Sequence, residues 1–365
     1  MSTSALLGGR ESRREIWTGP VIDADVHAVV PALDVLFEYM EPQWVDFARE
    51  RWLPGPDINT VYPPNAPTTV RAEWRTESGA NPASELACLQ QHILDPWDVE
   101  HAIVNCYYGI EWVRHPDFAG ALARALNNWL IGEWLDKDPR LRASLVLPAR
   151  NPAEMIKEIE RIGSHPGFVQ VLMPVRSDSL YGQRLWHPVY EAMARHELVF
   201  GLHWGGVSET APPTPTGWPS WFVEEYAGEQ QVFMAQLMSL VAEGVFSAYP
   251  TLKVAVGEIG FAWVPSFWWR METKRKGLRR DIPWVNQPVQ ELFRERIRFT
   301  VAPIDAGPPE ELAKIIEWIG SEDILMFATD YPHTHDDDLS VLLDVLGDSA
   351  QAKLMAGNAR ALYGL

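Results

Sequence analysis

The chain has 365 residues, of which 47% are hydrophobic and 22% are charged, and these values exclude a disordered or fibrous protein. Its 31 Lys and Arg residues against 49 Asp and Glu residues give a net charge of −18, which argues against nucleic acid and anionic membranes as partners. There is no apolar run of the roughly 18 residues that a membrane span requires, no secretory signal and no cysteine framework, so we expect a cytoplasmic protein.

Short apolar segments alternate with amphipathic stretches along the whole chain. Eight segments are predicted to be buried strands, at residues 21–25, 101–107, 142–148, 167–174, 198–203, 252–258, 296–302 and 324–330. Nearly continuous apolar strands indicate a parallel sheet that is covered on both faces. Eight strand–helix units predict an α/β fold, a (β/α)8 TIM barrel that forms one domain over residues 1–365. A doubly wound sheet is the alternative, but no G-x-G-x-x-G follows the first strand.

Two segments interrupt this alternation. Residues 54–84 are rich in Pro, Asn and Thr, and residues 204–230 hold four prolines and three tryptophans directly after the fifth strand. We expect both to be loop insertions at the C-terminal face of the strands. Long loops of this kind often act as lids, so the second insertion is predicted to be either a lid or an oligomer contact.

Polar side chains stand where several of the predicted strands end. They are, in chain order, Asp25, His27, His203, Glu258 and Asp330. Asp25 and His27 are two residues apart, so both face the same side of a strand. Strand ends of a barrel meet at one mouth, where catalytic residues gather. Each residue taken singly is more often structural, but two imidazoles and two carboxylates together suit Zn²⁺, Mn²⁺ or another borderline divalent cation.

Five segments carry a resemblance to a known family. They are VIDADVH at 21–27, GLHWGG at 201–206, GEIGFAWVP at 257–265, FATDYPH at 327–333 and GNARALYGL at 357–365. In this order they resemble the amidohydrolase superfamily, and within it the branch related to aminocarboxymuconate-semialdehyde decarboxylase. The resemblance covers nearly the whole chain and implies a metal-dependent enzyme with a TIM-barrel fold. It is specific for the superfamily and the branch, and much less so for the substrate.

The resemblance implies a mononuclear metal centre. The implied ligands are Asp25, His27, His203 and Asp330. Many members of the family open with His-x-His, whereas this chain has a carboxylate at position 25, which makes the site harder. No lysine ends a predicted strand, so nothing is placed to bridge two metals. We therefore expect one divalent metal ion, Zn²⁺ or Mn²⁺.

Two carboxylates are the expected catalytic groups. Asp330 is placed to touch both the metal and a bound water, and to accept a proton. Glu258 stands where decarboxylases of this branch often carry a histidine. It is expected to be a second acid/base with a pKa raised by burial near Trp263, or else to orient a metal-bound histidine.

Three residues are candidates for substrate binding. Arg176 follows the fourth strand and is suited to bind a substrate carboxylate, or alternatively to form a salt bridge. Trp204 suits a flat, conjugated or aromatic ligand, or else packs in the core. His333 is placed for a substrate contact. His335 stands before three aspartates, and we expect it to take part in a helix N-cap instead.

Three functions fit this pattern. The first is a metal-dependent nonoxidative decarboxylase of a small aromatic or unsaturated carboxylic acid, in which a carboxylic acid protonates carbon. The alternative is a hydrolase that uses metal-bound hydroxide on a C–N, C–O or C–C bond, which the missing sixth-strand histidine favours. The third is a barrel that has lost catalysis and serves as a scaffold, against which the intact ligand set argues. The family habit and the 17 tryptophans also predict a homodimer.

Overall fold

Eight parallel strands form one sheet in the order β1 to β8. The strands are β1 (Ile22–His27), β2 (His101–Asn105), β3 (Leu141–Val146), β4 (Phe168–Pro174), β5 (Val199–His203), β6 (Val254–Gly257), β7 (Ile297–Thr300) and β8 (Leu325–Met326). The backbone N–H groups of Asp330 and His27 donate to the carbonyls of Asp25 and Tyr331 at 3.0 and 2.8 Å, which joins the last strand region to the first. The predicted (β/α)8 TIM barrel is confirmed.

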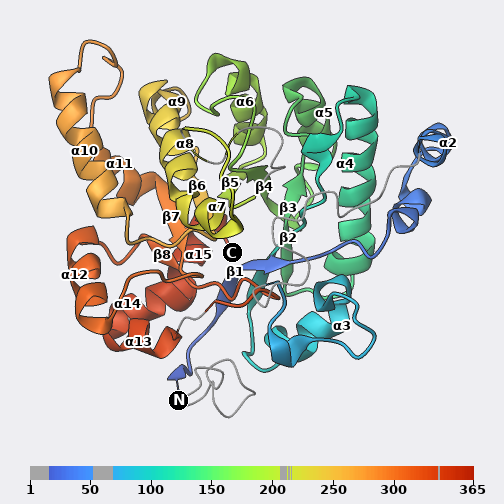
Figure 1. Ribbon diagram of the computed structural model, residues 1–365, viewed down its shortest axis with the longest axis horizontal. Coiled ribbons are helices and arrows are strands. Elements are labelled where there is room, and N and C mark those ends of the chain that lie inside the picture. Colours follow the sequence, from blue (N-terminus) through green and yellow to red (C-terminus); the bar gives the residue numbers. More distant parts are fainter. Residues whose placement is uncertain (1–15, 52–68, 206–211, 213, 215, 336–337) are drawn as a thin grey trace.

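This computed structural model describes residues 16–51, 69–205, 212, 214, 216–335 and 338–365. Helices follow the strands and surround them in a ring (Figure 1). In chain order they are α2 (Pro42–Glu50), α3 (Leu86–Leu89), α4 (Pro116–Leu130), α5 (Pro152–Ile162), α6 (His187–Arg195), α7 (Phe222–Gly228), α8 (Gln230–Ala242), α9 (Val245–Ala248), α10 (Val264–Gly277), α11 (Val289–Arg296), α12 (Pro309–Ile319), α13 (Leu339–Asp344), α14 (Asp348–Ala352) and α15 (Asn358–Tyr363).

Helix α5 shows how local sequence forms these elements. The Asn151 side chain accepts a hydrogen bond from the Glu154 N–H at 3.3 Å and caps the first turn. Pro152 occupies the start of the helix, where a missing N–H has no cost. Met155 and Ile159, one turn apart, are fully buried, so one stripe of the helix packs on the sheet while the opposite face meets solvent.

An irregularity in β1 turns the side chain of Asp25 toward the interior of the barrel. Ile22 and Ala24 pack inside the lower barrel, whereas Val26 belongs to the outer core between strands and helices. The pairing register of β1 on β2 shifts between Asp23 and Val26. A bulge of this kind changes which residues face which side. As a result Asp25 faces the barrel interior as Ile22 and Ala24 do, although regular alternation after Ala24 would have turned it to the opposite face.

The C-terminal helix closes the lower end of the barrel. Ala359 and Leu362 of α15 contact Ile22 and Val199, which lie on the opposite strands β1 and β5. A cluster that touches opposite strands must lie inside the barrel. Figure 1 shows the C-terminus at the centre of the ring of helices, next to β1. The chain end is therefore part of the barrel's interior packing.

The two predicted insertions differ from expectation where the structure describes them. Within 54–84, residues 69–84 hold two short 3-10 turns, at Ala72–Trp74 and Pro82–Ser84, and the rest of that segment lies outside the described residues. The end of 204–230 is helix α7, so this segment is not wholly a loop as predicted. Its first turn is fixed by the Glu224 carboxylate, which accepts from the Trp221 and Ser220 N–H groups at 2.8 and 3.0 Å.

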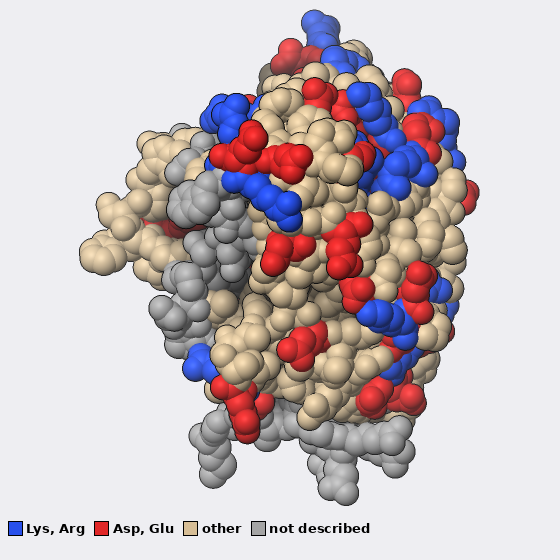
Figure 2. All heavy atoms as spheres, turned by 90° about the vertical axis from the view of Figure 1, so that its right-hand side faces the viewer, with Lys and Arg blue, Asp and Glu red and all other residues tan. Residues whose placement is uncertain are grey.

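The surface carries charges of both signs. On the face in Figure 2, Lys and Arg side chains alternate with Asp and Glu side chains and form no continuous basic stripe. Within the described ranges, none of the helices combines the length and the apolar character that a bilayer crossing requires.

Candidate metal centre and active site

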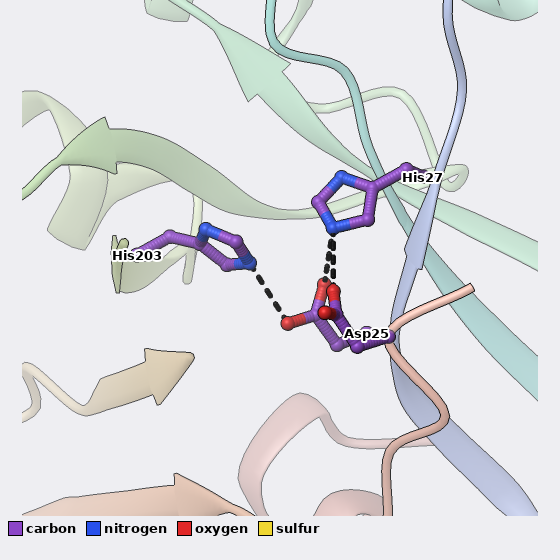
Figure 3. Close-up of side chains that lie close together, drawn as sticks. Asp25, His27 and His203 are labelled. Atoms are coloured by element: carbon purple, nitrogen blue, oxygen red, sulfur yellow. Dashed lines mark hydrogen bonds and ion pairs between the residues drawn. The ribbon is translucent and has the colours of Figure 1, made fainter. Parts of the chain in front are cut away.

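Four side chains that are far apart in the sequence converge at the C-terminal mouth of the barrel. Their candidate ligand atoms all lie within 4.8 Å of one another, and the residues are Asp25, His27, His203 and Asp330. His203 Nε2 lies 2.8 Å from Asp25 Oδ2, and His27 Nε2 lies 2.8 Å from Asp330 Oδ1. Figure 3 shows the imidazoles of His27, from β1, and His203, from β5, pointing toward the Asp25 carboxylate.

This cluster needs positive charge. The four residues expose 5% of their surface or less, so water screens them little. An imidazole nitrogen and a carboxylate oxygen at 2.8 Å repel unless a proton or a cation lies between them. Burial opposes a charged His203, but the adjacent Asp25 carboxylate outweighs it and raises the pKa of this imidazole. Two imidazoles and two carboxylates fit one divalent cation such as Zn²⁺ or Mn²⁺.

Local structure fixes the orientation of His203. Its Nδ1 donates to the Trp204 carbonyl at 2.8 Å, which leaves Nε2 facing Asp25. A glycine on the next strand makes room for the ring, because a Cβ at Gly257 would lie 2.5 Å from His203 Cδ2. The imidazole is thus held between the Trp204 carbonyl and the backbone of Gly257, which has no side chain.

Asp330 is the most highly connected residue of the site. Oδ1 faces His27, and Oδ2 faces His333 Nδ1 at 3.1 Å and His335 Nε2 at 2.6 Å. Burial alone would raise the pKa of Asp330, but the charge of His333 and the hydrogen bonds from the three imidazoles hold it well below its usual range. Its backbone is in the left-handed region, with φ 53°, a conformation that costs energy in a non-glycine residue and is typical of functional sites.

Glu258 lies at the edge of the same site. It is 3% exposed and also has a left-handed backbone, with φ 58°. One of its oxygens lies 3.8 Å from His203 Nδ1. Glu258 also forms a second group with His27, Asp330 and His333 in which the candidate ligand atoms lie within 4.8 Å of one another. The position suits both roles considered for Glu258, a proton donor facing the site and a partner of His203.

The structure places Arg176 in a buried salt bridge, the alternative that the sequence left open. Its Nε donates to Glu229 at 2.9 Å, and its Nη2 donates to Glu229 and to Glu225 at 3.1 and 2.5 Å. Burial raises the pKa of Glu229 to about 7, although the arginine opposes this. The guanidinium therefore ties helix α7 and the start of α8 to the end of β4.

The other two substrate-binding candidates lie close to the candidate metal ligands. Trp204 is 1% exposed, and its ring meets that of Tyr226 at 5.3 Å, so it packs between β5 and α7. The His333 ring lies 4.8 Å from that of His27 and is partly exposed. The His333 side chain is 16% exposed and that of His27 is 7% exposed, so His333 lies nearer to solvent.

Sequence reasoning missed three residues of the site. Asn105 Nδ2 donates to Asp25 Oδ1 at 2.7 Å, and the Tyr107 ring packs on His203 at 5.3 Å. Both residues lie at or just after the end of β2. The argument that catalytic residues gather at strand ends would therefore have found them. His335 contacts Asp330, and the expectation that it caps a helix is wrong, since the Asp338 carboxylate caps α13. Nothing in the local sequence distinguishes these two outcomes, because they depend on the path of the chain after Asp330.

Comparison with known proteins identifies the family. A family model described as amidohydrolase matches residues 22–365. The chain belongs to the amidohydrolase family. The family that the five sequence segments resemble is thereby confirmed.

Named relatives of this amidohydrolase include gamma-resorcylate decarboxylases. One, from Rhodococcus jostii, is 24% identical over 76% of this chain and 90% of its own length. Another, from Polaromonas sp., is 24% identical over 68% of this chain and 77% of its own length. A solved structure of 5-carboxyvanillate decarboxylase from Novosphingobium aromaticivorans, with bound manganese and 3-methoxy-4-hydroxy-5-nitrobenzoic acid, has a TM-score of 0.67 at 18% identity and covers 95% of this chain and 97% of that one.

Proposed function

We propose that this amidohydrolase is a metal-dependent nonoxidative decarboxylase of a small aromatic carboxylic acid. The observation that carries the proposal is the buried convergence of Asp25, His27, His203 and Asp330 at the barrel mouth. The names of its relatives support the reaction class, since gamma-resorcylate and 5-carboxyvanillate are aromatic carboxylates. We propose Mn²⁺ as the ion, because a site with two carboxylates is hard.

The proposed roles follow from position. The four ligands hold the ion, which when bound supplies a Lewis acid for the substrate's oxygens. Oδ2 of Asp330 accepts hydrogen bonds from His333 and His335, and Oδ1 faces the ion together with His27 Nε2, so Asp330 has no proton to deliver. Glu258 is buried beside His203 and is the carboxyl group that can face a ring carbon. His333 is partly exposed beside His27, and Tyr107, which is half-buried against His203, provides aromatic surface, whereas Trp204 supports the site from the core.

The reaction balances with one proton. Glu258 in its acid form transfers a proton to the ring carbon that bears the carboxylate, and a new C–H bond forms. The C–C bond then breaks, its electrons return to the ring, and CO₂ leaves. Glu258 regains a proton from water before the next turnover. General acid catalysis of this kind contributes about 10²–10⁴-fold to a rate.

The experiment uses purified protein loaded with Mn²⁺ and a panel of hydroxybenzoates, with CO₂ release as the readout. We expect Glu258→Gln to lower turnover by about 10²–10⁴-fold while Mn²⁺ binding remains. Asp178→Asn is the control, because Asp178 pairs with Arg150 and is not a member of the ligand cluster. Turnover by Glu258→Gln at the wild-type rate would show that Glu258 is not the general acid.

A hydrolase is the second candidate, and one feature favours it. The residue after β6 is Glu258 rather than the histidine that the decarboxylase resemblance implies. In that reaction Asp330 would accept a proton from water. Ester and amide substrates in ¹⁸O-labelled water separate the two candidates, since only hydrolysis places the label in the product. Labelled organic product from an ester or amide, together with no CO₂ release from any of the hydroxybenzoates, would reject the decarboxylase.

A further inference from the structure

A line of buried polar side chains crosses the barrel from the metal centre to the C-terminal helix. It consists of Asn105 at the end of β2, Ser144 in β3, Gln170 in β4 and Tyr363 at the end of α15. The first three side chains are at most 3% exposed and lie inside an otherwise apolar fold. A buried polar group destabilises the fold unless it is hydrogen-bonded. Four such groups in a line therefore indicate a role that offsets this cost.

Four hydrogen bonds connect the line end to end. The Tyr363 hydroxyl donates to Gln170 Oε1 at 3.0 Å, and Gln170 Nε2 donates to Ser144 Oγ at 2.7 Å. Ser144 Oγ donates to Asn105 Oδ1 at 2.6 Å, and Asn105 Nδ2 donates to Asp25 Oδ1 at 2.7 Å. Every donor points toward Asp25, and bonds aligned in one direction polarise one another.

The Asp25 carboxylate determines this direction. Carboxylate oxygens accept, so Asn105 must present its NH₂ group to Asp25 and its carbonyl oxygen to Ser144. The serine hydroxyl is then donated to Asn105, which leaves Ser144 Oγ as the acceptor for Gln170. Reversal of any one amide would place two donors or two acceptors in contact. The orientation of each member therefore depends on its neighbours.

The backbone is shaped to hold the line. His27 pairs with Asn105, and Ser144 pairs with Gln170, across adjacent strands. Gly201 on β5 leaves space for the glutamine, because a Cβ there would lie 2.5 Å from Gln170 Cδ. At the far end, Lys253 Nζ donates to the Leu362 carbonyl at 3.1 Å and holds the last turn of α15 against β6.

We propose that Asn105, Ser144, Gln170 and Tyr363 are positioning residues of the metal centre. The line holds Asp25 Oδ1 so that Oδ2 faces His203 Nε2, at 2.8 Å, and presents a preformed ligand pair to the ion. Partners that orient metal ligands contribute about 10–100-fold to metal affinity or activity. The C-terminal tyrosine thus influences the ion from the opposite end of the barrel. The inference rests on the ligand set proposed above.

The test compares the two ends of the line by calorimetric titration of metal-free protein with Mn²⁺. Its middle is unsuitable, because Gln170 Nε2 also lies 3.4 Å from Asn105 Oδ1 and offers a path around Ser144. We expect Asn105→Ala to weaken Mn²⁺ binding by about 10-fold or more, and Tyr363→Phe by about threefold. In the double variant Tyr363→Phe should add nothing, because the line is already broken.

Tyr249→Phe is the matched control. Its hydroxyl also makes one 3.0 Å hydrogen bond, to the His187 carbonyl, and is also partly buried, but it lies outside the line. Mn²⁺ affinity in this variant should equal that of the wild type. Equal affinities of Tyr363→Phe and Tyr249→Phe would overturn the role of the C-terminal end, even if Asn105→Ala does not fold. Folded wild-type protein that binds no Mn²⁺ would instead refute the metal centre, and with it the proposed function.

Discussion

Asp330 shows how much of the site depends on one residue. Its two oxygens face three imidazoles, one from β1 and two from the segment that follows Asp330, and it is fully buried. Asp330 thus joins the candidate ligand cluster to both His333 and His335.

At this scale we predict that Asp330→Asn lowers turnover by at least about 10²-fold and weakens Mn²⁺ binding. The asparagine keeps the shape but places an NH₂ group against imidazole donors and removes a charge. Steady-state kinetics and metal titration measure the two effects, and circular dichroism checks the fold. Full activity in this variant would contradict the assignment of Asp330.

The absence of a side chain is equally specific at Gly257. A Cβ there would lie 2.5 Å from His203 Cδ2 and 3.1 Å from Asp25 Oδ2, so Gly257→Ala should displace both ligands and lower Mn²⁺ affinity by about 10-fold or more. Gly277→Ala is the control, because nothing lies within 4 Å of its Cβ position, and this variant should bind Mn²⁺ like the wild type. Tight binding by Gly257→Ala would show that His203 is not a ligand.

At the scale of elements, salt bridges hold the end of the second insertion against the end of β4. Helix α7 carries Glu225, and Glu229 lies between α7 and α8, where both meet Arg176. One buried cation thus faces two carboxylates. Because Glu229 has a pKa of about 7 instead of 4.5, the folded protein holds a proton that the unfolded chain has lost between these two pH values.

It follows that the stability contributed by Glu229 is complete below pH 4.5 and falls as the pH rises to about 7, by up to about 3 kcal/mol. Glu229→Gln has no such proton, so the pH dependence of its free energy of unfolding should be flatter over this window. Urea unfolding at several pH values measures the difference. Glu225→Gln keeps Glu229 and should retain most of the slope, because burial is the main cause of the raised pKa and the charge of Glu225 a smaller one. Equal slopes in all three proteins would contradict the prediction.

At the scale of the whole molecule, the barrel has a mouth that holds the candidate site and a lower end filled by α15. Leu362 is 5% exposed within the interior cluster. We predict that Leu362→Ala lowers the free energy of unfolding by about 2–5 kcal/mol, because the cavity forms inside the closed sheet. Leu278→Ala, at a side chain 57% exposed, should change it by no more than about 0.5 kcal/mol. Chemical denaturation measures both, and similar losses would show that α15 is not part of the core.

The homodimer and the cytoplasmic location remain predictions.

Periodicity along the chain predicted the number of strands and the fold class, and the rule that parallel strands end at one mouth predicted the positions of Asp25, His27, His203, Glu258 and Asp330. The family followed from the resemblance of five short segments. All of these are local properties of the chain. Only the tertiary structure decided that His335 contacts Asp330, that Arg176 is bound by Glu225 and Glu229, and that Tyr363 reaches Asp25 through Asn105. The physical reason is that a hydrogen bond depends on the approach of atoms from distant segments, and this approach is set by how the elements pack.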